Sequence, residues 1–180
     1  FSDLQNNVWE RLCRIKSNRR LGSAYCFSGP TGSGKEYAAI EFAKLLNCEK
    51  FVEAACNKCE SCFKFKTLQH PNLKIIVPLP SSPKSNKDGG ALDGLKKEDI
   101  ELLTNSMINK GKNPFYKINI SNARRITISS IRDLRRDIYL KSKTPGRKII
   151  LIFDAHLLSE GAGESANALL KILEEPPNNT

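Results

Sequence analysis

A glycine-rich stretch near the start of the chain has the residues and spacing that hold a nucleotide phosphate. Gly29 is followed by four residues and then by Gly34 and Lys35, which matches the phosphate-loop pattern. Gly32 and Gly34 let the backbone N–H groups on either side of Ser33 turn inward, and the helix that follows adds positive potential. Lys35 reaches for the outer phosphates. A chance glycine turn is the alternative, and the strand, turn and helix order of this stretch disfavours it.

The residue after the loop lysine departs from this pattern. The position normally carries Ser or Thr, whose hydroxyl binds the Mg²⁺ that bridges the outer phosphates, and here it is Glu36. A longer, charged side chain cannot reproduce a hydroxyl packed beneath the phosphates, and it repels a polyanion. We therefore expect the loop to fold but to be less able to support chemistry.

The stretch "KIILIFDAH" supplies the other half of the same site. Phosphate-loop ATPases end such a strand in an acidic residue for Mg²⁺, often followed by a Glu that orients water. This strand ends in Phe153, Asp154 and Ala155, so one carboxylate is lost whether Asp154 takes the metal position or the Glu position. We expect no catalytic residue and a vestigial nucleotide site, with binding of ATP and Mg²⁺ left open; its residues are Gly29, Gly32, Ser33, Gly34, Lys35, Glu36 and Asp154.

Four of the six cysteines form a second candidate site. Cys48, Cys56, Cys59 and Cys62 are separated by seven, two and two residues. Four thiolates at this spacing suit a tetrahedral Zn²⁺ ion, and the zinc is expected to be structural because no coordination position remains for water. Disulfides are the alternative, disfavoured in a reducing compartment.

The remaining cysteines and one histidine are given other roles. Cys13 and Cys26 lie in apolar helix and strand contexts and are predicted to be core residues. His70 could compete as a metal ligand, but "HPNL" reads more naturally as a loop that enters the next strand.

Helices and strands alternate along the chain. Strands that are apolar on both sides, with helices between them, indicate an α/β fold with a parallel sheet flanked by helices. The predicted strands are 24–27, 73–80 and "GRKIILIFDAH" (146–156), and the predicted helices are 3–18 with a Ser2 capping box, one from Lys35, 95–110 ended by Gly111, one from Ser130, and 163–175. We expect one main domain over 1–180, a zinc module at 48–62, and a partly disordered insertion of unknown purpose at 81–116.

Composition limits the classes of function. The chain has 180 residues and a formal net charge of +10, which favours an anionic partner such as nucleic acid, although general solubility explains the charge equally well. No apolar run approaches the ~20 residues of a membrane span, and the first thirty residues lack a signal peptide. We expect a soluble, cytoplasmic protein with no membrane contact.

These motifs, in order, resemble the first domain of bacterial DNA polymerase III clamp-loader subunits. The resemblance rests on "RLGSAYCFSGP" before the loop, the four-cysteine module, "HPNL", "ISSIRDLRRDIYL", "GRKIILIFDAHLLS" and "ANALLKILEEPP". It covers nearly the whole chain apart from 81–116. It implies an AAA+ domain with a P-loop NTPase-like sheet, in a protein that helps load the sliding clamp onto primed DNA.

The resemblance also separates two kinds of subunit. The gamma/tau subunits hydrolyse ATP with an intact loop and a complete Asp-Glu pair, whereas the delta-prime subunit has degraded versions of both. Glu36, Phe153 and Ala155 match the degraded type. This implies a largely non-hydrolysing stator in a hetero-pentamer with delta and gamma/tau, within the DNA polymerase III holoenzyme, a nucleotidyltransferase. An active gamma/tau-like ATPase and another phosphate-loop protein acting on nucleic acid are the alternatives.

Further family features would lie outside this stretch of sequence. The arginine lent to a neighbour's ATP, the nucleotide-sensing asparagine, the lid and the collar are expected beyond Thr180, so we expect this chain to be a piece of a longer protein. Within the chain, Arg132, Arg135 and Arg136 mark a basic helix that could follow DNA phosphates, or could equally be a solvated face or a subunit interface.

Overall fold

The computed structural model describes residues 5–18, 21–51, 54–81, 89–142, 144–177 and 180. Three helices precede the first strand in this part of the chain, so the predicted alternation of strands and helices holds only from residue 73 onward. In order they are α1 Asn6–Ser17, α2 Lys35–Asn47, α3 Glu60–Lys66, β1 Leu73–Ile76, α4 Lys97–Lys112, α5 Ile128–Tyr139, β2 Ile149–Ile152, the short 3₁₀ helix η1 Ala155–Leu158, and α6 Glu164–Glu174.

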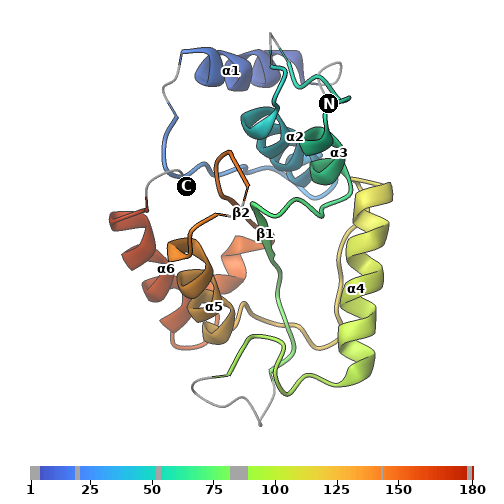
Figure 1. Cartoon of the computed structure of the whole chain (residues 1–180). Coiled ribbons are helices and arrows are strands. Elements are labelled where there is room, and N and C mark those ends of the chain that lie inside the picture. Colours follow the sequence, from blue (N-terminus) through green and yellow to red (C-terminus); the bar gives the residue numbers. More distant parts are fainter. Residues whose placement is uncertain (1–4, 19–20, 52–53, 82–88, 143, 178–179) are drawn as a thin grey trace.

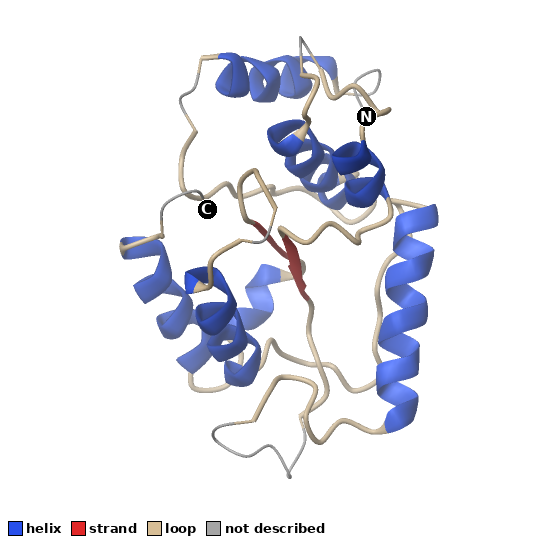
Figure 2. Ribbon diagram, viewed as in Figure 1, coloured by secondary structure: helices blue, strands red, loops and turns tan. Residues whose placement is uncertain are grey.

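The two strands form a small parallel sheet at the centre of the molecule (Figure 2). Leu73 lies opposite Ile149 and Ile76 opposite Ile152. The predicted parallel pairing is therefore confirmed. The first strand is shorter than the predicted 73–80 because Pro78 and Pro80 have no N–H to donate to a ladder; beyond β1, only Leu79 makes an isolated bridge, to Arg125.

The predicted strand at 24–27 is wrong. Within the described residues, no backbone hydrogen bond joins this segment to another strand. Its aromatic side chains pack on α2 instead, with the Tyr25 and Phe27 ring centres 5.2 Å and 6.3 Å from that of Phe42. Ring packing thus attaches the segment to α2 without pairing it with a strand.

Two helix boundaries also differ from the prediction. Helix α5 begins before Ser130, because the Thr127 side chain caps it and accepts a hydrogen bond from the Ser130 N–H. Helix α4 continues past Gly111, where a Cβ would lie 3.1 Å from the Thr67 carbonyl oxygen. Glycine is therefore required there by close packing and does not end the helix. The Ser2 capping box lies outside the described residues.

The helices surround the sheet as two groups and one separate helix, α4. Helices α1, α2 and α3 lie together at one end, while α4 runs along one side of the strands and α5 and α6 pack together on the other (Figure 1). As predicted, Ile131, Leu134 and Ile138 of α5 are buried, and they share a core with Ile172 of α6. The structure is thus a mixed α/β fold with a small parallel sheet flanked by helices.

Candidate functional site: a four-cysteine cluster and a phosphate loop

The four predicted cysteine ligands are brought together between α2 and α3. Cys48 directly follows α2, Cys59 caps the start of α3, and Cys62 lies in the first turn of α3. The four sulfur atoms all lie within 4.8 Å of one another, and the Cys56 and Cys62 sulfurs are 3.9 Å apart. With zinc–sulfur bonds of about 2.3 Å, a tetrahedral site needs sulfurs about 3.8 Å apart. The cluster therefore fits a metal ion.

The surroundings of the sulfurs also suit thiolate ligands. Backbone N–H groups of Cys56, Cys59 and Cys62 point at the sulfurs of Cys48, Cys56 and Cys59 over 3.2–3.4 Å. Hydrogen bonds from the backbone of Lys58 and of Cys59 lower the pKa of Cys56 to about 6, whereas burial raises the pKa of Cys48 and of Cys62. A bound cation would offset that burial and favour the charged thiolates. All six cysteines are free thiols.

His70 is not part of the cluster. Its Nδ1 accepts a hydrogen bond from the Asn72 N–H at 3.0 Å, so Nε2 carries the ring hydrogen and donates it to the Ser61 hydroxyl at 3.2 Å. The ring also stacks on Phe65, with ring centres 4.3 Å apart. Burial, with the nearby charge of Lys64 adding to it, lowers the pKa of His70. His70 thus packs against helix α3 through Ser61 and Phe65 and supports the helix that carries Cys62.

The other two cysteines differ in burial. Cys13 of α1 is partly buried and packs against the cluster's core, as predicted. Cys26 is exposed, so its predicted core role is wrong. The reason is that the segment 24–27 is not a strand within a sheet and leaves this side chain uncovered.

The phosphate-loop residues form the turn that leads into α2. Gly32 and Gly34 have φ of +83° and +78°, the left-handed region that glycine tolerates, and α2 begins at Lys35. The Lys35 ammonium donates to the Pro30 carbonyl at 3.2 Å, and so does the Ser33 N–H at 3.2 Å. The loop therefore folds onto itself, with its lysine held by the loop's own backbone.

Both acidic residues of the predicted site are paired with lysines that the sequence analysis did not single out. Glu36 forms an ion pair with Lys110 of α4, and Asp154 forms one with Lys117 at 3.7 Å. Lys110 continues the apolar stripe of α4 three residues after Met107, and a lysine on that stripe was the available signal. No comparable pattern marks Lys117.

These pairings do not fit a Mg²⁺ site. Mg²⁺ needs oxygen ligands in near-octahedral geometry, and here Glu36 is engaged by an ammonium while Phe153, at the end of β2, offers no oxygen and is buried. Asp154 has a left-handed backbone, with φ of 50°, and turns the chain into η1. At the position where a hydrolysing loop binds Mg²⁺, the Glu36 carboxylate is therefore already paired with a lysine of the same chain.

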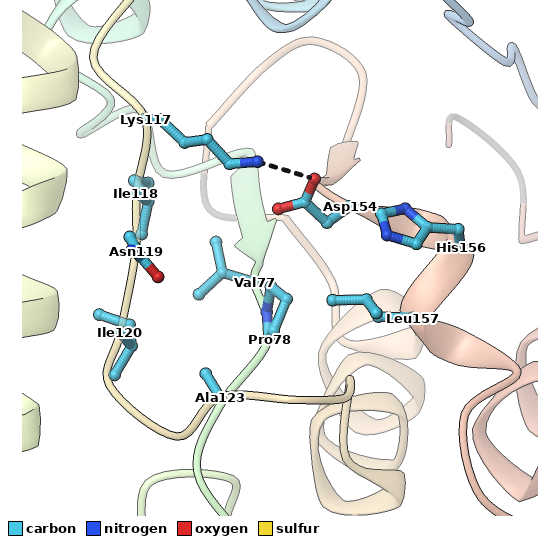
Figure 3. A pocket seen from close by; sticks show the side chains of 10 residues that line it. All are labelled: Val77, Pro78, Lys117, Ile118, Asn119, Ile120, Ala123, Asp154, His156 and Leu157. Carbon is cyan, nitrogen blue, oxygen red and sulfur yellow. Dashed lines mark ion pairs between the residues drawn. The ribbon is translucent and has the colours of Figure 1, made fainter. Parts of the chain in front are cut away.

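A cavity of about 220 Å³ opens beside the carboxyl ends of the two strands (Figure 3). The Lys117–Asp154 ion pair spans one side of it. Among the predicted loop-site residues, Asp154 alone lines this cavity; the other lining residues are Val77, Pro78, Lys117, Ile118, Asn119, Ile120, Ala123, His156 and Leu157. The cavity is thus separate from the turn that would hold a phosphate.

The three arginines predicted as a DNA or subunit contact lie exposed on α5. Arg136 is paired with Asp133 of the same helix. Asp137 of α5 forms an ion pair with Lys74 of β1 at 2.7 Å. Part of the basic character of α5 is therefore balanced within the molecule.

Comparison with known proteins decides the family. The family model described as "DNA polymerase III, delta subunit" matches residues 4–180. The chain belongs to this family. The predicted resemblance to clamp-loader subunits of DNA polymerase III is thereby confirmed, delta-prime included.

The relatives of this family member include two kinds of DNA polymerase III subunit. It is 29% identical to subunit tau of Bacillus subtilis, over 98% of this chain and 24% of the relative, and 31% identical to subunit tau/gamma of Haemophilus influenzae, over 98% and 19%. It is 26% identical to subunit delta' of Bacillus subtilis, over 100% of this chain and 41% of the relative. The chain thus spans between about a fifth and two fifths of these relatives.

Within the described helices of this family member, none is both long and apolar enough to cross a membrane. This agrees with the absence of a long apolar run in the sequence.

Proposed function

We propose that this chain is the phosphate-loop domain of a delta-prime-type clamp-loader subunit, a scaffold of AAA+ type that does not hydrolyse ATP. It would act in the cytoplasm, in a hetero-pentamer with delta and gamma/tau subunits that places the sliding clamp on primed DNA. The observation that carries this proposal is the Glu36–Lys110 ion pair. It occupies the carboxylate at the position where a hydrolysing loop has its metal-binding hydroxyl.

An ATP turnover assay on the full-length protein tests the scaffold role. We expect no hydrolysis above the background that a Lys35→Ala variant shows, because no residue of the loop is arranged to hold Mg²⁺. Steady turnover that Lys35→Ala abolishes would contradict the scaffold role.

A second candidate is an active gamma/tau-like ATPase. Sequence identity favours it, since the tau and tau/gamma relatives are 29% and 31% identical and the delta' relative 26%. Identity over the whole chain reports common descent and does not report the state of one site. The ion pair between Glu36 and Lys110 is an observation at the site itself, and it favours the scaffold. The same turnover assay separates the two candidates.

For the cysteine cluster we propose a structural Zn²⁺ ion held by Cys48, Cys56, Cys59 and Cys62. The support is four sulfurs within 4.8 Å, three of them from buried residues, in a chain whose family works inside the reducing cell. When bound, zinc would tie the end of α2 to the start of α3. Elemental analysis of the full-length protein should find about one zinc per chain; a well-folded, metal-free protein would contradict this.

Contact with DNA through α5 is also proposed. Arg132, Arg135 and Arg136 are exposed and could meet phosphates without reading bases. Replacing Arg135 and Arg136 together by alanine should lower the slope of log affinity against log salt for the assembled loader on primed DNA, by roughly one per lost phosphate contact. An unchanged slope would assign this face to solvent or to another subunit.

A further inference from the structure

One segment, from the end of α4 to Tyr116, touches both altered positions of the phosphate-loop site. The Lys110 ammonium is paired with Glu36 and donates to the Tyr116 carbonyl oxygen at 2.7 Å. It also lies 5.3 Å from the centre of the Phe153 ring. An ammonium has three N–H donors, and an aromatic face attracts a cation, so these three neighbours satisfy it. The two residues that differ from a hydrolysing loop are thus neighbours of one ammonium.

Burial makes this arrangement depend on Glu36. The Lys110 side chain is 1% exposed, and a charge so deeply buried is tolerated only when an opposite charge is close. Glu36 is 22% exposed and retains contact with water. The carboxylate that looked like a defect in the loop is therefore the counter-charge that lets a lysine sit inside the protein.

The same segment also covers the loop itself. The Phe115 and Tyr37 rings are 5.2 Å apart in an edge-on contact, and a Cβ placed on Gly34 would lie 3.4 Å from the Phe115 ring. Behind the helix, Gly111 is packed against the Thr67 backbone. The position of Lys110 is thus fixed from both sides and is not that of a loose surface side chain.

We propose that the Lys110 ammonium is a built-in cation that closes the metal position of the phosphate loop. It uses up the negative charge of Glu36 and places a positive charge beside Phe153, which takes the metal position of the strand end if Asp154 stands in the Glu position. A divalent cation entering this position would meet like charge and would compete with the ammonium for the Glu36 carboxylate. Mg²⁺ therefore adds nothing to the binding of a nucleotide phosphate at this loop. The segment 81–116, left without a role by the sequence, supplies this cation.

The inference rests on the proposed function only in assuming that the loop is not a working Mg²⁺·ATP site. ATP affinity of the full-length protein is measured by calorimetry with excess Mg²⁺ and without Mg²⁺. No chelator is used, because a chelator would also strip a metal from the cysteines. The variants are Glu36→Ser, which supplies the usual hydroxyl, Lys110→Met, and the two combined. Lys44→Met, which removes another buried lysine from an ion pair with Glu41, is the matched control.

In the wild type, in Glu36→Ser and in Lys44→Met, affinity should be the same with and without Mg²⁺, including the case of no measurable binding in either. In the combined variant, Mg²⁺ should tighten ATP by about tenfold or more, which corresponds to about 1.4 kcal/mol. Glu36→Ser alone strands Lys110 and can unfold, so the wild type and the combined variant decide the matter.

Two results would overturn the inference. One is a tenfold tightening by Mg²⁺ in the wild type or in folded Glu36→Ser, and the other is a combined variant that remains insensitive to Mg²⁺. Failure of the proposed function looks different, because a protein that joins no loader pentamer would leave these affinity ratios unchanged. Wild-type affinity that depends on Mg²⁺, without turnover, would overturn this inference and leave the scaffold role standing.

Discussion

The two candidate sites of this domain treat charge in opposite ways. The cysteine cluster gathers four sulfurs within 4.8 Å, with backbone N–H groups aimed at three of them. The phosphate loop has two carboxylates nearby, and a lysine of the same chain is paired with each. One site is arranged to receive a cation from outside, and the other already contains its cations. One end of the chain thus has a cluster that could hold a metal ion, and the other has carboxylates paired with its own lysines.

Removal of a cysteine ligand should give the largest effect. Cys59→Ser leaves three thiolates for zinc, and we expect a loss of at least about 4 kcal/mol, because structural zinc binding is coupled to folding. This would lower the melting temperature by about 8–16 °C for a domain of this size. Calorimetry with elemental analysis checks it. The control is Cys26→Ser, which changes an exposed cysteine outside the cluster. Equal melting temperatures for the two variants would contradict a stabilising role of a metal at the cluster.

The next largest effect is expected from removing one partner of the Glu36–Lys110 ion pair. The loss of stability should depend on which partner is removed. Glu36→Gln leaves the Lys110 ammonium buried without a counter-charge and should cost about 3 kcal/mol. Lys110→Met leaves a carboxylate that still reaches water and puts an apolar side chain against Phe153, so about 1 kcal/mol is expected. Urea unfolding of both variants measures the difference.

The control for this pair is Glu10→Gln on α1. Glu10 is paired with Arg14 at 3.3 Å, with both side chains at least half exposed, so its loss should change little. If Lys110→Met proved as costly as Glu36→Gln, the claim that the lysine depends on the glutamate more than the reverse would be wrong.

Lowering the pH should reduce the stability of the region around the cysteines, because His70 becomes protonated. Burial lowers the pKa of His70 below its ordinary value of 6.5, so the unfolded chain binds more protons than the folded one just below that pH. Stability is therefore complete above about pH 6.5 and falls as the pH drops toward the lowered pKa. The loss should be smaller than that of Glu36→Gln. Urea unfolding of the zinc-saturated protein at several pH values measures it.

The control is His70→Gln, whose amide can still donate to Ser61 but does not titrate. Its stability should depend less on pH between 6.5 and 5.5, a window set by the ordinary histidine pKa. A variant with the same pH dependence as the wild type would assign the acid effect to the cysteines.

The sequence predicted one end of the domain better than the other, for a physical reason. The cysteine ligands lie within fifteen residues, so local spacing determined their convergence. The glycines and Lys35 are local in the same way, and α2 begins at the predicted residue. The pairing of Glu36 with Lys110 joins positions 74 residues apart, and no local period encodes it. Only the lysine on the apolar stripe of α4 hinted at a buried partner.

The strand at 24–27 failed for a related reason. A short apolar run can become a strand only if another backbone pairs with it, and that partner is not visible in the run itself. Here the neighbouring rings of Tyr25, Phe27 and Phe42 took that place. The same misreading produced the wrong core role for Cys26. The turn before α2 and the convergence of the four cysteines followed from local spacing, whereas the pairing of Glu36 with Lys110 had to come from the structure.

The smallest effect is expected from Lys117, the lysine paired with Asp154. Lys117 is 56% exposed and its ammonium lies 3.7 Å from the Asp154 carboxylate, a pair open to water on the cavity side (Figure 3). Lys117→Met should therefore change the free energy of unfolding by less than about 1 kcal/mol, the usual range for such pairs. Urea unfolding beside Glu36→Gln tests this. A cost as large as that of Glu36→Gln would mean that the site is closed equally by both lysines, whereas a negligible one leaves the buried ammonium of Lys110 as the charge on which the closed site depends.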